Sequence, residues 1–377
     1  MRFTRKFYSL LVFLLAISSS VVHVKASSLS PRGTKYEQHV AKQYSSWWQK
    51  TVMTLGKQGV LHFREPVHEE ITNRIFGCEG DRTLCGDPDV EFAGPFILAG
   101  VRWNDDPPFQ LHGGEGKHTS CNVAETIRVT TQPLCWVQLF KAAKKAAASG
   151  DVPDAYNHAP LLGRSHFGDL QFLHAMASRD GETAEETQKR VMMWEEFTWK
   201  VAIGTYGLDT KLQDVNIPGF DAFFGNSEWT VQDLFTVGNP ALRPHIEELA
   251  FGSALHTIED SFAKGHVQRE KSTTPETCAG FPQALVPPRI IEFHSYAHQD
   301  ESKHAKFDTR DAFEQETAED NPSVVPVAST SQRARGICLE TLHLRRSHGC
   351  QKWGGLRWLR GVDLNHRPLG YEPRRSI

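Results

Sequence analysis

Residues 241–264 form the segment that most constrains how this chain can fold. Four apolar residues recur there mostly at three- and four-residue intervals: Leu249, Leu255, Ile258 and Phe262. That spacing predicts a helix with an apolar stripe. His256 and Asp260 lie four residues apart, so the same helix would carry an imidazole and a carboxylate on one face, and His266 follows Gly265, which is expected to end the helix. The segment therefore predicts a packed helix that also contributes to a metal site.

Helical patterns also dominate the rest of residues 36–313. Residues 66–75 start with Pro and are followed by Gly77, residues 135–149 are rich in Ala and Lys and stop before Gly150, and residues 183–203 run unbroken. No convincing series of alternating strands and no repeat of fixed period occurs. A chain of 377 residues, 39% of them hydrophobic, can fill a core. We therefore expect an all-α fold, a multi-helix single domain over residues 27–325 with a metal-binding cleft.

The two ends of the chain differ from this helical body. Residues 1–26 combine an early basic cluster, a short apolar run and a small-x-small ending at Ala26, which is typical of a secretory signal peptide cleaved after Ala26. Residues 326–377 lack periodicity and are expected to be a low-order basic tail; they resemble peptides that arise by readthrough or frame error. A basic tail that binds a membrane or nucleic acid is the functional alternative.

Charge is distributed unevenly along the chain. The total is −3, while residues 331–377 hold ten basic and three acidic side chains and residues 1–26 hold four basic and no acidic ones, so residues 27–330 carry −14. A body of that charge attracts a polyphosphate chain weakly.

The seven cysteines fit an exported protein with disulfides. Cys78 with Cys85, or Cys121 with Cys135, would close a short loop. An odd number leaves one cysteine over, and we expect it to be Cys338 or Cys350.

Further candidate ligands fall on or beside the expected helices. His68 lies in the helix of residues 66–75, with His62 six residues before it. The apolar helix of residues 96–101 stops before Pro107 and would offer Asp105 or Asp106 at its end. Residues 165–173 would place His166 on another helix. Further on, His304 and Asp308 repeat the four-residue interval between an imidazole and a carboxylate.

A single histidine on an amphipathic helix is more often structural than a ligand. Several helices that each present His or Asp would bury a costly cluster of polar side chains unless something bound there, and metal ions are the simplest explanation. Imidazole and carboxylate are ligands that suit zinc. The pattern therefore indicates a zinc site.

Taken in order, these elements resemble the superfamily of zinc-dependent phospholipases C and single-strand-specific zinc nucleases. The resemblance spans residues 60–310. It implies an all-helical domain with two or three zinc ions in a cleft. Asp105 or Asp106, His166, His256 and Asp260 would hold one ion, Asp260 would bridge to a second ion that also takes His68, and His266, His304 and Asp308 would hold the third.

The chain also departs from the family pattern. Family members begin with a Trp that binds zinc a few residues before the first His, whereas cleavage after Ala26 leaves Ser27, so His62 is an alternative ligand. The long interval between Asp105 and His166 leaves His118 as an alternative to His166. His294, whose fourth neighbour is His298 rather than an acid, is the alternative to His304 with Asp308.

The function expected from the resemblance is an exported zinc-dependent phosphoesterase that hydrolyses a phosphodiester through zinc-activated water, with Asp105 or Asp106 orienting or deprotonating that water. The charge of −14 on residues 27–330 favours a phospholipid head group over nucleic acid as substrate. The alternatives are a single-strand-specific nuclease and a non-catalytic exported helical protein that binds metal. Oligomeric state is open, and no transmembrane span is expected in the mature chain.

Overall fold

The computed structural model describes residues 29, 33–44, 66–79, 82–87, 89–111, 121–123, 125–155, 159–179, 181–225, 228–237, 239–270, 276–278, 281–286, 288–296 and 307. The expected signal peptide, the expected basic tail and five candidate ligands lie outside these residues: His62, His118, His298, His304 and Asp308. They stay predictions.

The described chain is mostly helical. The α-helices are α2 (Lys35–Tyr44), α4 (Val67–Ile75), α5 (Arg82–Cys85), α6 (Pro95–Val101), α7 (Pro133–Ala148), α8 (Leu161–Phe167), α9 (Ala184–Ala202), α10 (Asp221–Phe224), α11 (Val231–Thr236) and α12 (Ile246–Asp260). The 3₁₀ helices are η1 (Gln171–His174), η2 (Leu212–Asp214) and η3 (Pro240–His245). The strands are β1 (Val267–Arg269), β2 (Glu276–Cys278), β3 (Phe281–Val286) and β4 (Ile290–Phe293).

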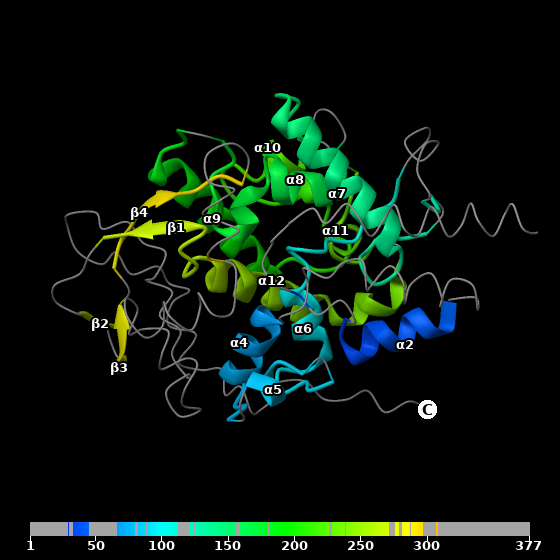
Figure 1. Ribbon diagram of the computed structural model, residues 1–377, viewed down its shortest axis with the longest axis horizontal. Helices are drawn as coiled ribbons and strands as arrows, with labels where there is room; N and C mark the ends of the chain where they lie inside the picture. The colour runs from blue at the N-terminus through cyan, green and yellow to red at the C-terminus, as the bar shows by residue number, and fades with distance from the viewer. Residues whose placement is uncertain are drawn as a thin grey trace, which may run out of the picture.

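Helix α12 runs through the middle of the fold, with α9 on one side and α4 and α6 on the other (Figure 1). Its residues 252–260 are all buried, so this helix is covered on every side rather than along one stripe. Trp194 and Phe197 of α9 belong to the large apolar cluster beside it, and a second cluster joins α7 to α8 through Trp136, Phe140 and Phe167. Because α12 carries His256 and Asp260, the candidate site lies in the interior.

Local sequence explains where several helices begin. A capping box starts α9: the Thr183 hydroxyl accepts the backbone N–H of Glu186, and the Glu186 carboxylate accepts the Thr183 N–H at 3.0 Å. Pro95 and Pro133 occupy the first position of α6 and α7, where a missing N–H costs nothing. The helices expected over residues 66–75, 96–101, 135–149 and 183–203 are therefore confirmed with small changes at their ends.

The helix expected over residues 241–264 is shorter than predicted. A 3₁₀ segment occupies residues 240–245 because Pro244 cannot continue an α-helical hydrogen-bond ladder through that turn. Helix α12 then ends at Asp260, with the backbone N–H of Ser261 bonded to the last carbonyls. The prediction that Gly265 ends the helix is therefore wrong, and His266 instead directly precedes β1.

The expectation that the fold contains helices alone is also corrected. Strand β1 pairs antiparallel with β4, with Val267 opposite Phe293, and β2 pairs antiparallel with β3. These strands are three to six residues long, too short for an alternating pattern to stand out in the sequence. The coarser prediction, a mostly helical protein, is confirmed.

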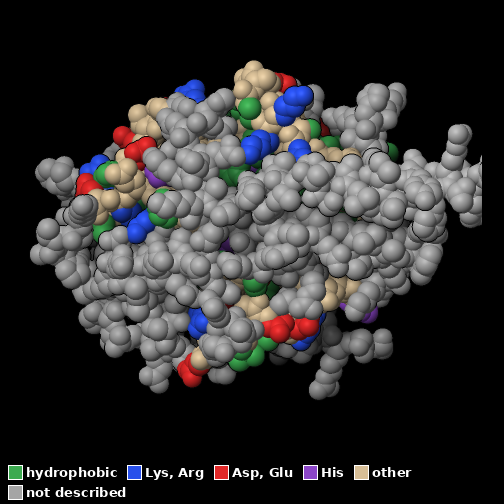
Figure 2. All heavy atoms as spheres, viewed as in Figure 1, with side chains coloured by type: hydrophobic (Ala, Val, Ile, Leu, Met, Phe, Trp, Pro, Cys, Tyr) green, Lys and Arg blue, Asp and Glu red, His purple; other side chains and the backbone are tan. Residues whose placement is uncertain are grey.

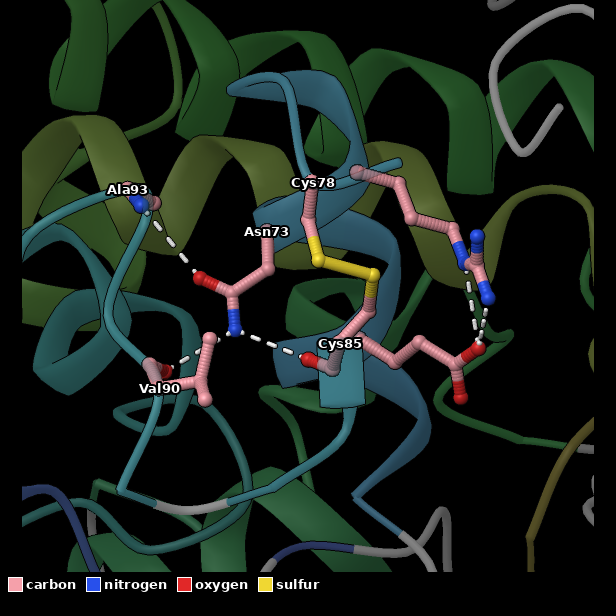
Figure 3. Close-up of a disulfide and its surroundings, with 7 residues drawn as sticks. Asn73, Cys78, Cys85, Val90 and Ala93 are labelled. Atoms are coloured by element: carbon pink, nitrogen blue, oxygen red, sulfur yellow. Dashed lines mark hydrogen bonds and ion pairs between the residues drawn. A yellow bond between two sulfur atoms is a disulfide. The ribbon is translucent and has the colours of Figure 1, made fainter. Parts of the chain in front are cut away.

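Both predicted disulfides are present: Cys78 with Cys85, and Cys121 with Cys135. The first lies just after α4, next to Asn73 (Figure 3). The Asn73 amide donates to the carbonyl oxygens of Cys85 at 2.9 Å and Val90 at 3.1 Å, while its oxygen accepts the N–H of Ala93 at 3.3 Å. This bracing fixes the C-terminal end of the helix that carries His68.

A buried ionic network joins the N-terminal helices. The guanidinium of Arg102 is fully buried and donates to Glu37 at 3.0 Å and to Glu69 at 2.6 Å. Arg128 contacts the other oxygen of Glu37 at 2.7 Å. Glu37 lies on α2, Glu69 on α4, Arg102 just after α6 and Arg128 before α7. The network therefore holds these elements together around the chain that precedes Asp105.

In the described part of the chain, no helix has both the length and the apolar character that a bilayer span requires. Acidic and basic side chains are interspersed among the described residues visible in Figure 2, and histidine contributes little there.

Candidate metal centre

Helix α12 places His256 and Asp260 on one face, four residues apart. The His256 Nε2 and an Asp260 oxygen lie 2.9 Å apart, and the two side chains are 0% and 1% exposed. The other ring nitrogen of His256, Nδ1, donates to the carbonyl oxygen of Val101 at 2.7 Å. The imidazole is therefore oriented by the backbone of a neighbouring helix, α6.

Two glycines allow that orientation. A Cβ at Gly252 would overlap the Ile97 carbonyl oxygen, and one at Gly100 would overlap the Leu249 carbonyl oxygen. Helices α6 and α12 consequently cross with backbone against backbone. Only this close approach lets His256 reach a carbonyl at the end of α6.

The loop after α6 delivers Asp105. Asn104 anchors the loop: its amide donates to the Leu173 carbonyl oxygen at 2.7 Å and to the Thr257 hydroxyl at 3.0 Å. Asp105 Oδ1 then lies 4.0 Å from His256 Nε2. The loop is thus tied both to α12 and to η1.

Asp106, the alternative to Asp105, is held by other partners. Its carboxylate accepts the Val129 N–H at 2.9 Å and the Arg128 Nε–H at 3.1 Å. Burial raises the pKa of Asp106 to about 6, although Arg128 and the hydrogen bond from Val129 oppose the rise. Asp106 belongs to the ionic network, and Asp105 is the aspartate that meets the imidazoles.

Helix α4, which packs on the side of α12 opposite α9, contributes His68. Its Nε2 lies 3.3 Å from Asp260 Oδ1, and its Nδ1 lies 2.8 Å from Glu259 Oε2. Burial alone would lower the pKa of His68, but Asp260 and Glu259 outweigh burial and hold that pKa well above its ordinary value. His68 is therefore clamped between two carboxylates of α12.

Two histidines approach from the segment that follows α7. His166 on α8 points Nε2 toward Asp105 Oδ1 at 3.9 Å, and its Nδ1 lies 3.1 Å from the Leu162 carbonyl oxygen. His174, at the end of η1, places Nδ1 at 3.0 Å from Asp260 Oδ2 and 3.1 Å from His256 Nε2. His174 is a site residue that the sequence analysis missed.

The backbone after His174 is strained. Ala175 has φ 49° and ψ 41°, the left-handed conformation, and is fully buried. For a residue with a Cβ this conformation costs roughly 1–2 kcal/mol. The strain is offset by fixed contacts on both sides, including the bond from the Ala177 N–H to the His294 carbonyl oxygen at 2.8 Å.

These side chains form three overlapping groups whose potential ligand atoms lie within 4.8 Å of one another: His68 with Asp105 and His256, Asp105 with His166 and His174, and His174 with His256 and Asp260. We call the six residues together the His/Asp cluster. Zinc at about 2.0–2.1 Å from nitrogen or oxygen ligands in a tetrahedron requires ligand atoms roughly 3.3 Å apart. The nearest contacts in the cluster, from 2.9 to 4.0 Å, bracket that spacing.

Protonation gives an independent test of the fit to a cation. A carbonyl oxygen only accepts, so the proton of neutral His256 is assigned to Nδ1, which faces Val101, and Nε2 carries a lone pair. Burial, together with His68, lowers the pKa of His256 to about 3, so the ring is neutral at pH 7. Burial would raise the pKa of Asp260, but His266 and His68 hold it well below its ordinary value, so Asp260 is ionised.

The 2.9 Å contact between His256 and Asp260 thus sets a lone pair against a carboxylate. Burial lowers the pKa of His174, so this ring is also neutral and has one N–H to donate. That single N–H can bond to the His256 lone pair or to the Asp260 carboxylate but cannot fully satisfy both, and the His174 Nε2 has no hydrogen-bond partner. A bound cation would turn each repulsive contact into an attractive one. The donor set of imidazoles and carboxylates fits zinc.

His266 and His294 lie beside the cluster but outside its three groups. The His266 Nδ1 donates to the His174 carbonyl oxygen at 2.7 Å and lies 3.6 Å from Asp260 Oδ1. The backbone N–H of His294 donates to the His266 carbonyl oxygen at 2.8 Å, and the ring Nδ1 of His294 lies 3.0 Å from the Gly265 carbonyl oxygen. The β1–β4 pairing therefore places the backbones of His266 and His294 side by side, and the assignment of either residue as a ligand stays a prediction.

Of the predicted ligands that the structure describes, His68, Asp105, His166, His256 and Asp260 converge in the cluster. No known protein family, no curated protein and no solved structure matches this chain. The site must therefore be interpreted from its own chemistry.

Proposed function

We propose that this chain is an exported zinc-dependent phosphoesterase that hydrolyses a phosphodiester, with a phospholipid head group as the favoured substrate. The observation that carries the proposal is the His/Asp cluster, in which two aspartates and four histidines from four separate segments meet within ligand distance. So many buried acceptors in one place are costly without a cation. The two disulfides among the described residues suit an exported protein.

Zinc held by such a cluster lowers the pKa of water and polarises a phosphate oxygen. Two aspartates of the cluster have separate proposed roles beside the ion. Asp105 is shared by two of the three groups, and its Oδ1 faces His166, His174 and His256 at 3.7 to 4.0 Å, so it is placed to orient a water or accept its proton. Asp260 contacts imidazoles through both oxygens and is the proposed bridging carboxylate.

The preference for a phospholipid head group or another small phosphodiester rests on charge. Residues 27–330 carry −14, which disfavours a long polyphosphate chain away from the immediate site. Binding of single-stranded DNA that weakens steeply with salt would overturn this preference in favour of a nuclease.

A pair of adjacent substitutions tests the proposal. Asp105→Asn removes a cluster carboxylate, and we expect it to lower both the zinc content and the hydrolysis of a chromogenic phosphocholine ester by about 100-fold or more. Asp106→Asn is the matched control, because it alters a buried aspartate that pairs with Arg128 instead. It should reduce stability while the zinc content stays near that of the wild type. Full zinc content and full activity in Asp105→Asn would rule the proposal out.

Burial of the cluster favours a second candidate, a non-catalytic exported protein that stores or senses metal. His256, Asp260 and Asp105 are all at most 2% exposed, whereas a substrate must reach the reacting atoms. Zinc at a stoichiometric level without turnover of any phosphodiester would favour this candidate. Turnover that disappears with a chelator and returns with zinc would favour the phosphoesterase.

A further inference from the structure

Glu259 makes a contact that the metal cluster itself does not require. It lies on α12 between His256 and Asp260, yet it faces α4, where its Oε2 lies 2.8 Å from the His68 Nδ1. Its other oxygen accepts the hydroxyl of Thr72 at 2.7 Å. Both carboxylate oxygens are therefore fixed, and the side chain is 4% exposed.

This arrangement differs from that of four other histidines around the site; the fifth, His174, has its Nδ1 3.0 Å from Asp260 Oδ2, a carboxylate of the cluster itself. His166, His256, His266 and His294 each direct Nδ1 to a backbone carbonyl oxygen, at 3.1, 2.7, 2.7 and 3.0 Å. His68 directs Nδ1 instead to a carboxylate that lies outside the cluster. A carboxylate behind a metal-binding imidazole fixes its tautomer and orientation and raises its strength as a ligand more than a neutral acceptor does.

Geometry indicates why His68 needs such support. It is the one member of the His/Asp cluster that α4 supplies, whereas α12 supplies two, and it belongs to a single one of the three groups. A cation at its Nε2 would rely on Asp105 and His256, which the neighbouring groups share. Stronger binding by His68 offsets that competition.

We propose that Glu259 is a positioning residue that holds the His68 imidazole with Nε2 toward the cluster and strengthens it as a zinc ligand. The inference rests on the proposed metal centre and deepens it. Thr72 supports the role, because its hydroxyl prevents the carboxylate from rotating away from His68. Glu259 itself stays behind the imidazole and does not touch the ion.

The chain offers a closely matched control. Glu182 is also a buried carboxylate that accepts a threonine hydroxyl, from Thr187 at 2.7 Å, and a cationic N–H, from Arg190 at 2.6 Å. It lies just before α9, and neither of these two partners belongs to the His/Asp cluster. Glu259→Gln and Glu182→Gln therefore remove the same charge from the same kind of site, with and without a metal ligand behind it.

The experiment is a titration of the metal-free full-length chain with Zn²⁺ by calorimetry and with Co²⁺ by visible absorption, for the wild type and both variants. For Glu259→Gln we expect one binding step to weaken by about 10–100-fold and its Co²⁺ bands to shift, while the remaining binding stays within about twofold. Glu182→Gln should leave every step unchanged. Each variant's unfolding in urea with chelator measures the purely structural cost.

Unchanged metal binding in Glu259→Gln, with a loss of stability equal to that of Glu182→Gln, would overturn the inference and leave the proposed function standing. A wild-type chain that binds no metal would overturn the proposed function itself. If Glu259→Gln does not fold, Thr72→Val decides the matter, because it keeps the carboxylate but frees Oε1. A several-fold loss in the same binding step supports the inference, and unchanged binding contradicts it.

Discussion

Replacement of Gly252 by Ala tests whether the backbone contact between α6 and α12 positions the site. The new Cβ would overlap the Ile97 carbonyl oxygen and lie 2.6 Å from the Val101 nitrogen and 2.8 Å from the Gly100 carbonyl carbon. All three are backbone atoms, so no side chain can rotate away. The helices must separate, which lengthens the 2.7 Å bond between His256 and the Val101 carbonyl oxygen.

The expected magnitude follows from two opposed effects. Alanine is favoured over glycine inside a helix by about 1 kcal/mol. Overpacking of a core costs about 1–3 kcal/mol, and more when only backbone can yield. We expect Gly252→Ala to lower the free energy of unfolding by about 2 kcal/mol or more, roughly a 30-fold shift of the folding equilibrium.

The assay is urea unfolding of the metal-free chain, followed by tryptophan fluorescence, with zinc affinity measured in parallel. Gly207→Ala is the control, because nothing lies within 4 Å of its added Cβ. It should change stability by less than about 0.5 kcal/mol. Equal stability and equal zinc affinity of Gly252→Ala and the wild type would refute the argument that this crossing sets the site.

Three further predictions concern the cluster and the disulfides. His174→Ala should reduce zinc affinity by about 10–100-fold, measured by calorimetry, since His174 is common to two groups of ligands; unaltered affinity would remove it from the site. Metal-free stability should fall as pH drops from about 6.5 toward 3, because the lowered pKa of His256, about 3, lets the unfolded chain bind a proton first, at about 1.4 kcal/mol per pH unit; the lowered pKa of His174 acts in the same direction. The raised pKa of His68 acts oppositely: its contribution is complete below about pH 6.5 and is lost as pH rises through its folded value, so His68→Gln should abolish this loss of stability at higher pH; because His68 also lowers the pKa of His256, the variant's acid loss in urea melts should be shallower. Loss of the Cys78–Cys85 bridge, whose partners are 7 residues apart, should cost about 2 kcal/mol, and loss of Cys121–Cys135, 14 residues apart, about 3 kcal/mol by thermal unfolding.

Local spacing predicted the parts of the structure that local physics determines. His256 and Asp260 meet because residues four apart share a helix face, and this holds wherever the helix packs. The two disulfides followed from short loops between cysteines, and the ends of α4 and α7 followed from Gly77 and Gly150, whereas Gly265 misled the prediction for α12. Even here Pro244 shortened α12 at its start, since a single residue can break a hydrogen-bond ladder that the apolar pattern suggests.

Long-range contacts decided what the sequence left open. Asp105 and Asp106 are neighbours of the same type, and the choice between them is made by Arg128 and Val129, more than twenty residues later. His174 depends on a 3₁₀ turn and a left-handed Ala175, neither of which has a clear sequence signal. Glu259 is buried because α4 covers it with His68 and Thr72, which lie 191 and 187 residues earlier in the chain.

The same contacts explain why the interior of this protein is polar at its centre. Without a cation, the cluster sets the lone pair of His256 against ionised Asp260 and buries six ionisable groups, and an apolar core of equal volume would be more stable. Two close-packed glycines, a strained alanine and a buried carboxylate nevertheless hold these groups together. Under the proposed function a bound zinc ion would supply the missing attraction, so zinc binding would stabilise the folded chain.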